Sequence, residues 1–197
     1  MIRRRTFAAT LLLTTAVASP ALAHAVPGDA DPGRNLYVMV GPLVSPGFRA
    51  CCGDERDGSF IDVGVEVSAF RFVPASGTIF TQTGYGGLVQ AQTGGLALTD
   101  HPSPKDPGKH ARLAIGGEGT VGPLGAQAGL MTRIDSGPYG TGVGPFAGLF
   151  FSVGVFSAAV QVDVPVVSSG DARMPILLIF PVTAKWPIII DGGSPPR

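Results

Sequence analysis

Two adjacent cysteines, Cys51 and Cys52, are the only cysteines in the 197-residue sequence and the side chains best suited to covalent chemistry. A disulfide normally joins cysteines whose Cα atoms are about 4.4–6.8 Å apart, so a bond between neighbours would close a small, strained ring. A zinc site needs about four ligands, and no cluster of His or Cys surrounds the pair in the sequence. We expect a vicinal or intermolecular disulfide, with free thiols and a metal site as the alternatives.

His101 and Ser103 are the residue types of a general base and a nucleophile. Their His-x-Ser spacing is similar to that of outer-membrane lipid A deacylases, which implies a lipid-modifying barrel enzyme. In that family the pair lies on a strand, whereas prolines flank Ser103 here and indicate a loop. Because a general base must be held in geometry to work, we expect a solvated loop and no catalytic residue. An adventitious metal site at His101, Asp106 and His110 is a minor alternative, and no cofactor is predicted.

Two glycine-rich segments, 84–87 and 116–119, have the composition of phosphate-binding loops. Neither opens a predicted helix and neither is followed by Lys-Ser or Lys-Thr, so the context of a phosphate loop is missing. We expect these glycines to relieve crowding between coiled strands. The acidic segment 54–58 lacks the alternating ligand spacing of a calcium loop and is expected to be a solvated loop tip.

The first 23 residues have the three parts of an export signal. Arginines at 3–5 form a basic region, an apolar region follows, and Ala21-Leu22-Ala23 is a small-residue cleavage site. The apolar run is shorter than the roughly 20 residues that a spanning helix needs. We predict a cleaved signal peptide at 1–23, with cleavage after Ala25 as the alternative, and a linker at 24–34. The mature chain then reaches an oxidising compartment, where disulfides persist.

The composition excludes two classes of protein. Gly and Pro are abundant, at 29 and 18 residues, but 45% of residues are hydrophobic and only 14% are charged. Disorder requires low hydrophobicity and high charge, so a disordered chain is excluded. Removing the three signal arginines from the 14 basic residues leaves 11 against 14 acidic ones, a net charge of −3. Nucleic-acid binding needs a basic face and is not expected.

From Asn35 onward, apolar and polar residues alternate with a period of two in segments separated by Gly, Pro, Asp and Ser, which is typical of strands. Eight strands are predicted, at 36–43, 60–73, 78–92, 111–121, 125–134, 141–151, 155–166 and 175–186. The connections 45–59 and 93–110 are long, whereas 74–77 and 122–124 are short.

The alternation gives the strands one apolar face, with residues such as Val65 and Val162, and one face of small and polar residues. The polar face carries seven charged residues: Asp62, Glu66, Arg112, Glu118, Arg133, Asp163 and Lys185. A glycine-rich face with isolated charges of both signs makes a poor solvent surface but suits a narrow lumen. The apolar face suits hydrocarbon, and only helices and closed barrels can span a bilayer. The sequence therefore predicts an all-β fold, an eight-stranded antiparallel up-and-down transmembrane β-barrel.

Strands of about ten residues, with short turns at one end and longer loops at the other, are typical of transmembrane barrels. Over residues 35–187 the pattern resembles the small eight-stranded outer-membrane barrels of Gram-negative bacteria, the outer-membrane protein A type. The resemblance implies outer-membrane localisation, a periplasmic N-terminus, and outer-membrane lipid and the barrel-insertion machinery as partners. Such barrels usually end on an aromatic residue, whereas this chain continues past Trp186 into a predicted tail at 188–197. Trp186 would then be an internal signal aromatic.

Eight strands enclose an interior just wide enough for side chains, so no open pore is expected. Loops carry function in this architecture, and we predict a structural or surface-interaction role without enzymatic activity. The loops 45–59 and 93–110 would contact a surface partner. The alternatives are a secreted soluble β-barrel or sandwich that binds a small apolar ligand, and a lipid-modifying barrel enzyme.

The seven lumen charges are expected to form one ionic network, because a buried charge that loses its partner costs several kcal/mol. We expect Arg112 or Arg133 to bridge Glu66 and Glu118. The alternative is that these side chains lie near the rims and contact only water. Nine aromatic residues near strand ends suit a membrane interface: Tyr37, Phe48, Phe60, Phe72, Phe80, Tyr139, Phe150, Phe151 and Trp186.

Overall fold

The computed structural model describes residues 36–50, 59–73, 83–97, 109–136, 139–170 and 174–190. The predicted signal peptide and linker, the Cys51 and Cys52 pair, the His101 and Ser103 loop and the acidic segment 54–58 lie outside the described residues. Within the described ranges, no helix is long and apolar enough to cross a membrane.

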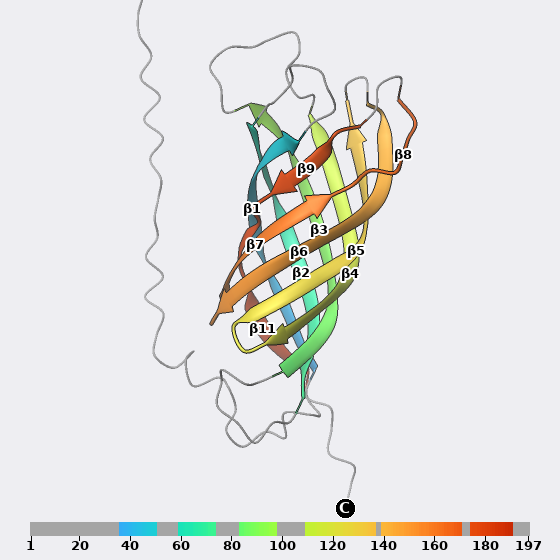
Figure 1. Ribbon diagram of the computed structural model, residues 1–197. Helices are drawn as coiled ribbons and strands as arrows, with labels where there is room; N and C mark the ends of the chain where they lie inside the picture. The colour runs from blue at the N-terminus through green and yellow to red at the C-terminus, as the bar shows by residue number, and fades with distance from the viewer. Residues whose placement is uncertain are drawn as a thin grey trace, which may run out of the picture.

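The described residues form six long strands and five short ones (Figure 1). The long strands are β1 (Leu36–Ala50), β2 (Ser59–Phe72), β3 (Thr83–Ala97), β4 (His110–Val121), β5 (Leu124–Asp135) and β6 (Thr141–Val153). The short ones are β7 (Phe156–Asp163), β8 (Val167–Ser168), β9 (Ile176–Ile179), β10 (Val182–Ala184) and β11 (Trp186–Ile190). β7 and β8 succeed each other along β6 and make a seventh strand. β9, β10 and β11 succeed one another along β1 and make an eighth.

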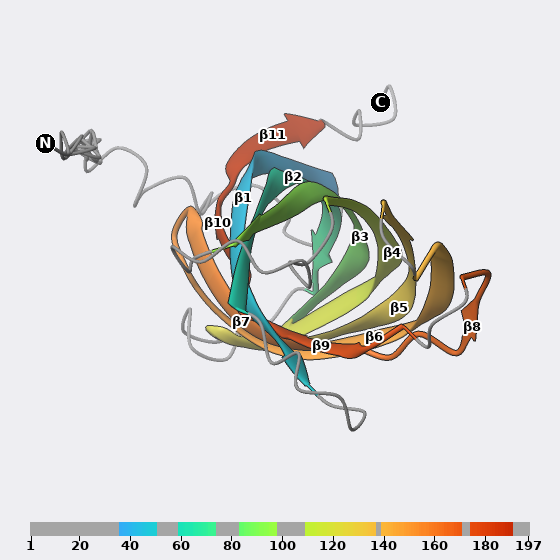
Figure 2. The same cartoon turned by 90° about the horizontal axis from the view of Figure 1, so that it is seen from above.

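Antiparallel pairing joins these eight strands into a closed cylinder (Figure 2). Each of β1 to β6 pairs with the next strand along the chain, and β7 continues the sheet from β6. The eighth strand then lies between β7 on one side and β1 on the other, through the pairs β9–β7, β10–β7, β9–β1 and β10–β1. The predicted fold, an all-β, eight-stranded, antiparallel up-and-down barrel, is confirmed.

The breaks in the last two strands do not open the sheet. The backbone N–H of Val164 donates to the carbonyl of Pro145 at 3.0 Å, and the N–H of Phe180 donates to the carbonyl of Pro46 at 2.8 Å. On the other side of the eighth strand, the N–H of Lys185 donates to the carbonyl of Val155 at 2.7 Å. Backbone pairing therefore continues between the short strands.

Glycine forms the two tightest turns. Gly122 and Pro123 join β4 to β5, and Gly154 and Val155 join β6 to β7. Both glycines have φ = 60°, a conformation that residues with a Cβ avoid. Glycine at the first central position is what a two-residue type II′ hairpin turn requires.

Two predicted strand boundaries are wrong. The first strand was expected to end at residue 43, but β1 continues to Ala50, and the third was expected to end at residue 92 but continues to Ala97. The expected first residues of the third strand, 78–82, lie outside the described residues. Pro46 has the character of a turn residue in the sequence, yet it is paired within the sheet: it lies opposite Ile61 of β2 and its carbonyl accepts the bond from Phe180. Cross-strand pairing, which the sequence does not display, sets both boundaries.

These shifts change the connections. The two long connections are shorter than expected, because β1 ends at Ala50 and β3 at Ala97. The connection expected at 74–77 lies outside the described residues. At the other end of the chain, β11 extends to Ile190 and pairs with β1, so the first residues of the predicted 188–197 tail belong to the barrel.

The interior glycines make room for aromatic rings. A Cβ on Gly116 or Gly129 would come within 2.8 Å of the Phe146 ring, and a Cβ on Gly84 would collide with the Phe70 ring. Phe146 and Phe70 are both 2% exposed. Crowding inside a small barrel therefore accounts for Gly84, Gly86 and Gly116, whereas a Cβ on Gly87, Gly117 or Gly119 would meet nothing closer than 3.6 Å.

An interfacial role requires the aromatic residues to face outward, and the structure shows that only some of them do. Phe48, Phe151 and Trp186 are half-exposed on the outer face. Four others are instead buried: Tyr37, Phe60, Tyr139 and Phe150. Phe72 packs edge-on against the Tyr37 ring, with centroids 5.5 Å apart. Phe80 lies outside the described residues. A position near a strand end does not show whether a side chain faces the lumen or the outside. Successive side chains of a strand point to opposite faces, so the face depends on whether the residue is at an odd or an even position in its strand.

Candidate functional site in the barrel interior

The barrel interior holds all seven charged side chains that the sequence assigned to the polar face. None is more than 8% exposed: Asp62, Glu66, Arg112, Glu118, Arg133, Asp163 and Lys185. They come from β2, β4, β5 and β7 and from the residue between β10 and β11. Inward alternation on each strand brings these sequence-distant groups into one enclosed space.

Arg112 is the centre of the polar contacts in the middle of the barrel. Its Nε and Nη2 donate to the two carboxylate oxygens of Asp163, at 2.6 and 3.0 Å. Its Nη1 donates to Oε1 of Gln90 at 2.9 Å, and Nε2 of Gln90 donates to Oε2 of Glu66 at 2.9 Å. A bidentate guanidinium–carboxylate pair has strong, directional hydrogen bonds, so these contacts tie β4 to β7, β3 and β2 across the lumen.

Lys185 is the residue that joins Glu66 and Glu118. Its Nζ forms an ion pair with Glu66, lies 3.9 Å from Oε2 of Glu118, and donates to the Ser68 hydroxyl at 3.0 Å. The expectation that Arg112 or Arg133 bridges the two glutamates is therefore wrong. Closure of the sheet places the eighth strand beside β1, one strand away from β2, and the sequence did not reveal that proximity.

Glutamine amides extend the same set of contacts. Gln161 donates to Oδ1 of Asp163 at 2.9 Å, and Gln127 donates to Oε1 of Gln161 at 3.1 Å. We call the connected residues the central network: Glu66, Ser68, Gln90, Arg112, Glu118, Gln127, Gln161, Asp163 and Lys185. Gln90 was not among the residues expected in the lumen. Its place on the inward face of a strand is the sequence signal that identifies it.

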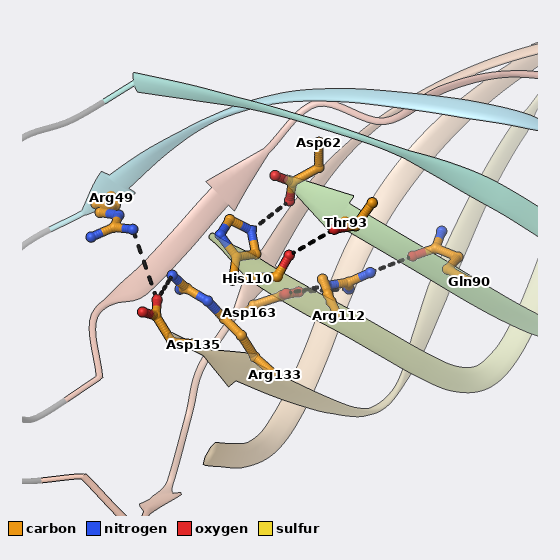
Figure 3. A network of polar contacts seen from close by, with 9 residues as sticks. All are labelled: Arg49, Asp62, Gln90, Thr93, His110, Arg112, Arg133, Asp135 and Asp163. Atoms are coloured by element: carbon orange, nitrogen blue, oxygen red, sulfur yellow. Dashed lines mark hydrogen bonds and ion pairs between the residues drawn. The ribbon is translucent and has the colours of Figure 1, made fainter. Parts of the chain in front are cut away.

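A second group, the rim cluster, lies near the ends of β1, β2, β4 and β5 (Figure 3). Arg133 donates to Oδ2 of Asp135 at 2.9 Å, and Nη2 of Arg49 lies 4.0 Å from the same oxygen. The guanidinium of Arg49 also lies over the Tyr139 ring, 5.6 Å from its centroid. Arg49 and Asp135 were missed because the sequence assigned both positions to connections.

His110 and Asp62 complete the rim cluster. Nε2 of His110 lies 2.9 Å from Oδ2 of Asp62 (Figure 3), and both side chains are fully buried. Gly94 lies between them on β3, opposite both residues in the sheet register. A Cβ on Gly94 would collide with the Asp62 carboxylate, so glycine is what lets the two side chains meet across the intervening strand.

The charges in this interior nearly cancel. Within the part of the chain that the structure describes, four buried cationic side chains, Arg49, Arg112, Arg133 and Lys185, accompany five buried carboxylates, Asp62, Glu66, Glu118, Asp135 and Asp163. Asp62 contacts His110, which would balance the fifth carboxylate if protonated. A low-dielectric interior accepts charges only when they are paired and hydrogen-bonded, and this near balance suits a lumen filled by its own side chains.

The geometry offers no catalytic arrangement among the described residues. Nδ1 of His110, the nitrogen that a nucleophile would approach, is buried and has no hydrogen-bond partner within the described ranges. Over the same ranges, no three His, Cys, Asp or Glu side chains are grouped closely enough to hold a metal ion. Apolar side chains fill the space beside the central network: Leu88, Ala114, Met131 and Phe146.

Comparisons with other proteins do not identify a family. The sequence matches no protein-family model and no curated protein. Among solved structures, the attachment invasion locus protein Ail of Yersinia pestis is similar to this chain at 10% sequence identity. The likeness covers 78% of this chain and 98% of that one, with a TM-score of 0.22. At that score the likeness decides nothing, and the fold follows from the strand pairing alone.

Replacing Lys185 with methionine should strongly destabilise the barrel. The substitution preserves most of the side-chain volume but leaves Glu66 and Glu118 without their cation, and breaking a buried pair costs about 3–5 kcal/mol. We expect a lower unfolding midpoint in a urea titration followed by the fluorescence of the single tryptophan. Adding Glu66→Gln to Lys185→Met should restore part of the loss, whereas Arg71→Met, which removes an exposed cation, should have little effect. An unchanged midpoint for Lys185→Met would show that the central network does not stabilise the fold.

The two arginines of β4 and β5 should differ in their effect on stability. Arg112 makes three hydrogen bonds, whereas Nε and Nη1 of Arg133 are buried without a partner within the described ranges. Removing Arg112 breaks a buried charge pair, which is costly. The native fold already loses about 1–3 kcal/mol for each unsatisfied donor of Arg133, so removing Arg133 also removes that cost. We therefore expect Arg112→Met to lower the unfolding midpoint more than Arg133→Met in the same titration. The reverse order would contradict the pairing described here.

Proposed function

We propose that this chain is an outer-membrane β-barrel that spans the bilayer and acts through the loops at its outer end, as a structural or surface-interaction protein. The observation that carries the proposal is the inverted polarity of the barrel. Of the twelve largest fully buried side chains among the described residues, six are polar or charged: Arg112, Arg133, Gln90, Gln161, Asp62 and Asp163. A water-soluble domain would bury mainly apolar groups.

The outer face supports the same proposal. Large apolar side chains are extensively exposed on strands all around the barrel, with Ile115 at 61%, Leu130 at 60% and Leu149 at 70%. A contiguous apolar surface of this extent would be a liability in water and marks an interaction with a membrane or another protein. Because the sheet is closed, every strand can pair its backbone internally, which the hydrocarbon region requires.

The proposed orientation rests on the connections. The two tight turns, 122–123 and 154–155, lie at one end of the barrel, and the connections 51–58 and 98–109 lie at the other. We place the first end in the periplasm and the second outside, where these connections would contact a surface partner.

The filled interior argues against a diffusion pore. The central network and the apolar residues beside it are buried side chains that occupy the lumen. We therefore expect no channel conductance in planar bilayers. Barrel-insertion machinery and outer-membrane lipid remain the proposed assembly partners, with Trp186, half-exposed on the outer face, as the candidate signal aromatic.

Cell fractionation combined with heat-modifiable gel mobility tests this proposal. A membrane barrel should sediment with outer membranes, need detergent to stay monodisperse, and migrate differently in SDS before and after boiling. A protein that is monodisperse in buffer without detergent would instead be the secreted soluble barrel, and the membrane proposal would fail.

A charge on the outer face should block insertion in proportion to its depth. Val65 and Val162 lie outward, at 51% and 39% exposure, and Val65 is at the middle of β2. Arginine near the bilayer midplane costs about 2–4 kcal/mol, falling to about 0–1 kcal/mol near an interface. We expect Val65→Arg and Val162→Arg to reduce the heat-modifiable fraction, and Val121→Arg, at the end of β4, to be tolerated. Equal assembly of all three variants would count against the membrane orientation.

A further inference from the structure

Two arginines of the rim cluster are buried while most of their hydrogen-bond donors are unused. Arg49 and Arg133 are 5% and 1% exposed. Nε and Nη2 of Arg49, and Nε and Nη1 of Arg133, have no hydrogen-bond partner among the residues that the structure describes. A buried donor without an acceptor destabilises a fold, and more so when the group is charged. The rim cluster therefore has four guanidinium nitrogens that need an acceptor.

The central network shows that burial in this barrel does not by itself leave an arginine unsatisfied. Nε, Nη1 and Nη2 of Arg112 all donate to side chains of that network. In the rim cluster, Arg49 and Arg133 instead approach a single oxygen, Oδ2 of Asp135 (Figure 3). Nη2 of Arg133 donates to it at 2.9 Å, whereas Nη2 of Arg49 is 4.0 Å away, too far for a hydrogen bond. Two cations thus converge on one carboxylate oxygen and retain unused donors.

The unused nitrogens of Arg49 form a complete fork. Nε and Nη2 are the same two atoms through which Arg112 binds both oxygens of the Asp163 carboxylate. The guanidinium of Arg49 lies over the Tyr139 ring, 5.6 Å from its centroid, and this contact restricts its orientation. Arg133 adds a further donor, Nε or Nη1, while its Nη2 is held by Asp135.

The charges of the rim cluster leave a place for one more anion. Its other carboxylate, Asp62, is engaged by His110, with 2.9 Å between Oδ2 and Nε2. When His110 is protonated, it balances Asp62, and Arg49 and Arg133 are then left with Asp135 as their counter-charge. A water molecule would satisfy the unused donors but would supply no negative charge.

We propose that Arg49 and Arg133 form a binding site for a small oxyanion of the phosphate or sulfate type. Guanidinium forks match the spacing of two oxygens on such an anion, and hydrogen bonds between ions are stronger than neutral ones. The anion accepts from Nε and Nη2 of Arg49 and from Arg133. The site lies near the ends of β1 and β5 that the proposed orientation places outside. It goes beyond the proposed function, since its geometry does not depend on the membrane.

Calorimetric titration of inorganic phosphate, and separately of sulfate, into the purified full chain in detergent tests the site, with chloride holding the ionic strength constant. We expect saturable binding of one anion per barrel. Arg49→Met and Arg133→Met should each weaken it at least roughly tenfold, the effect of losing a hydrogen bond to a charged group. Arg49→Lys keeps the charge but removes the fork, and it should also weaken binding. Arg71→Met is the matched control, because Arg71 is an exposed arginine on β2.

Absence of saturable binding in the wild type would overturn the site. Unchanged affinity in folded Arg49→Met or Arg133→Met would do the same, as would an equal loss in Arg71→Met. Heat-modifiable mobility reports the folding of each variant, and Arg49→Lys with Arg133→Lys replaces the methionine variants if those do not fold. A barrel that binds phosphate but is monodisperse without detergent would reject the proposed function and leave this site standing.

Discussion

Closure of the sheet is the constraint on which the rest of the structure depends. The pairing of β1 with β9, β10 and β11 turns a sheet with two free edges into a cylinder. A closed sheet satisfies its backbone groups internally and separates each strand into a residue set that faces a narrow lumen and a set that faces outward. The composition of the two sets then decides what the lumen holds and what surrounds the barrel.

The charged groups of the lumen are buried, and a low-dielectric interior accepts charges only when they are paired. Arg112 and Lys185 do this for the central network: one holds Asp163 and Gln90, and the other lies between Glu66 and Glu118. Because these contacts join strands on opposite sides of the cylinder, the network braces the barrel as well as neutralising its charges. The buried side chains that occupy the lumen support the proposal that the function lies in the loops and not in the lumen.

The outer face follows from the same separation. Its large exposed side chains are mostly apolar and differ in size from position to position. Where a small residue such as Ala158 is set between Phe151 and Val182, the surface is hollowed. A surface formed by alternation alone is therefore not uniform in its relief.

The sequence by itself determined the fold class and the inward set of residues. Period-two alternation assigns a face to Glu66, Arg112 and Val65 wherever the strand is recognised, because successive side chains of a strand point to opposite faces. It did not determine the strand ends at Ala50 and Ala97. Prolines and glycines occur inside these coiled barrel strands as well as in turns, so composition alone does not distinguish the two. Nor could it determine partners: Arg112 meets Asp163, 51 residues away, and Lys185 meets Ser68, 117 residues away. Those contacts exist only because closure brings the last strand beside the first, and closure is a property of the whole sheet that no local pattern of residues contains.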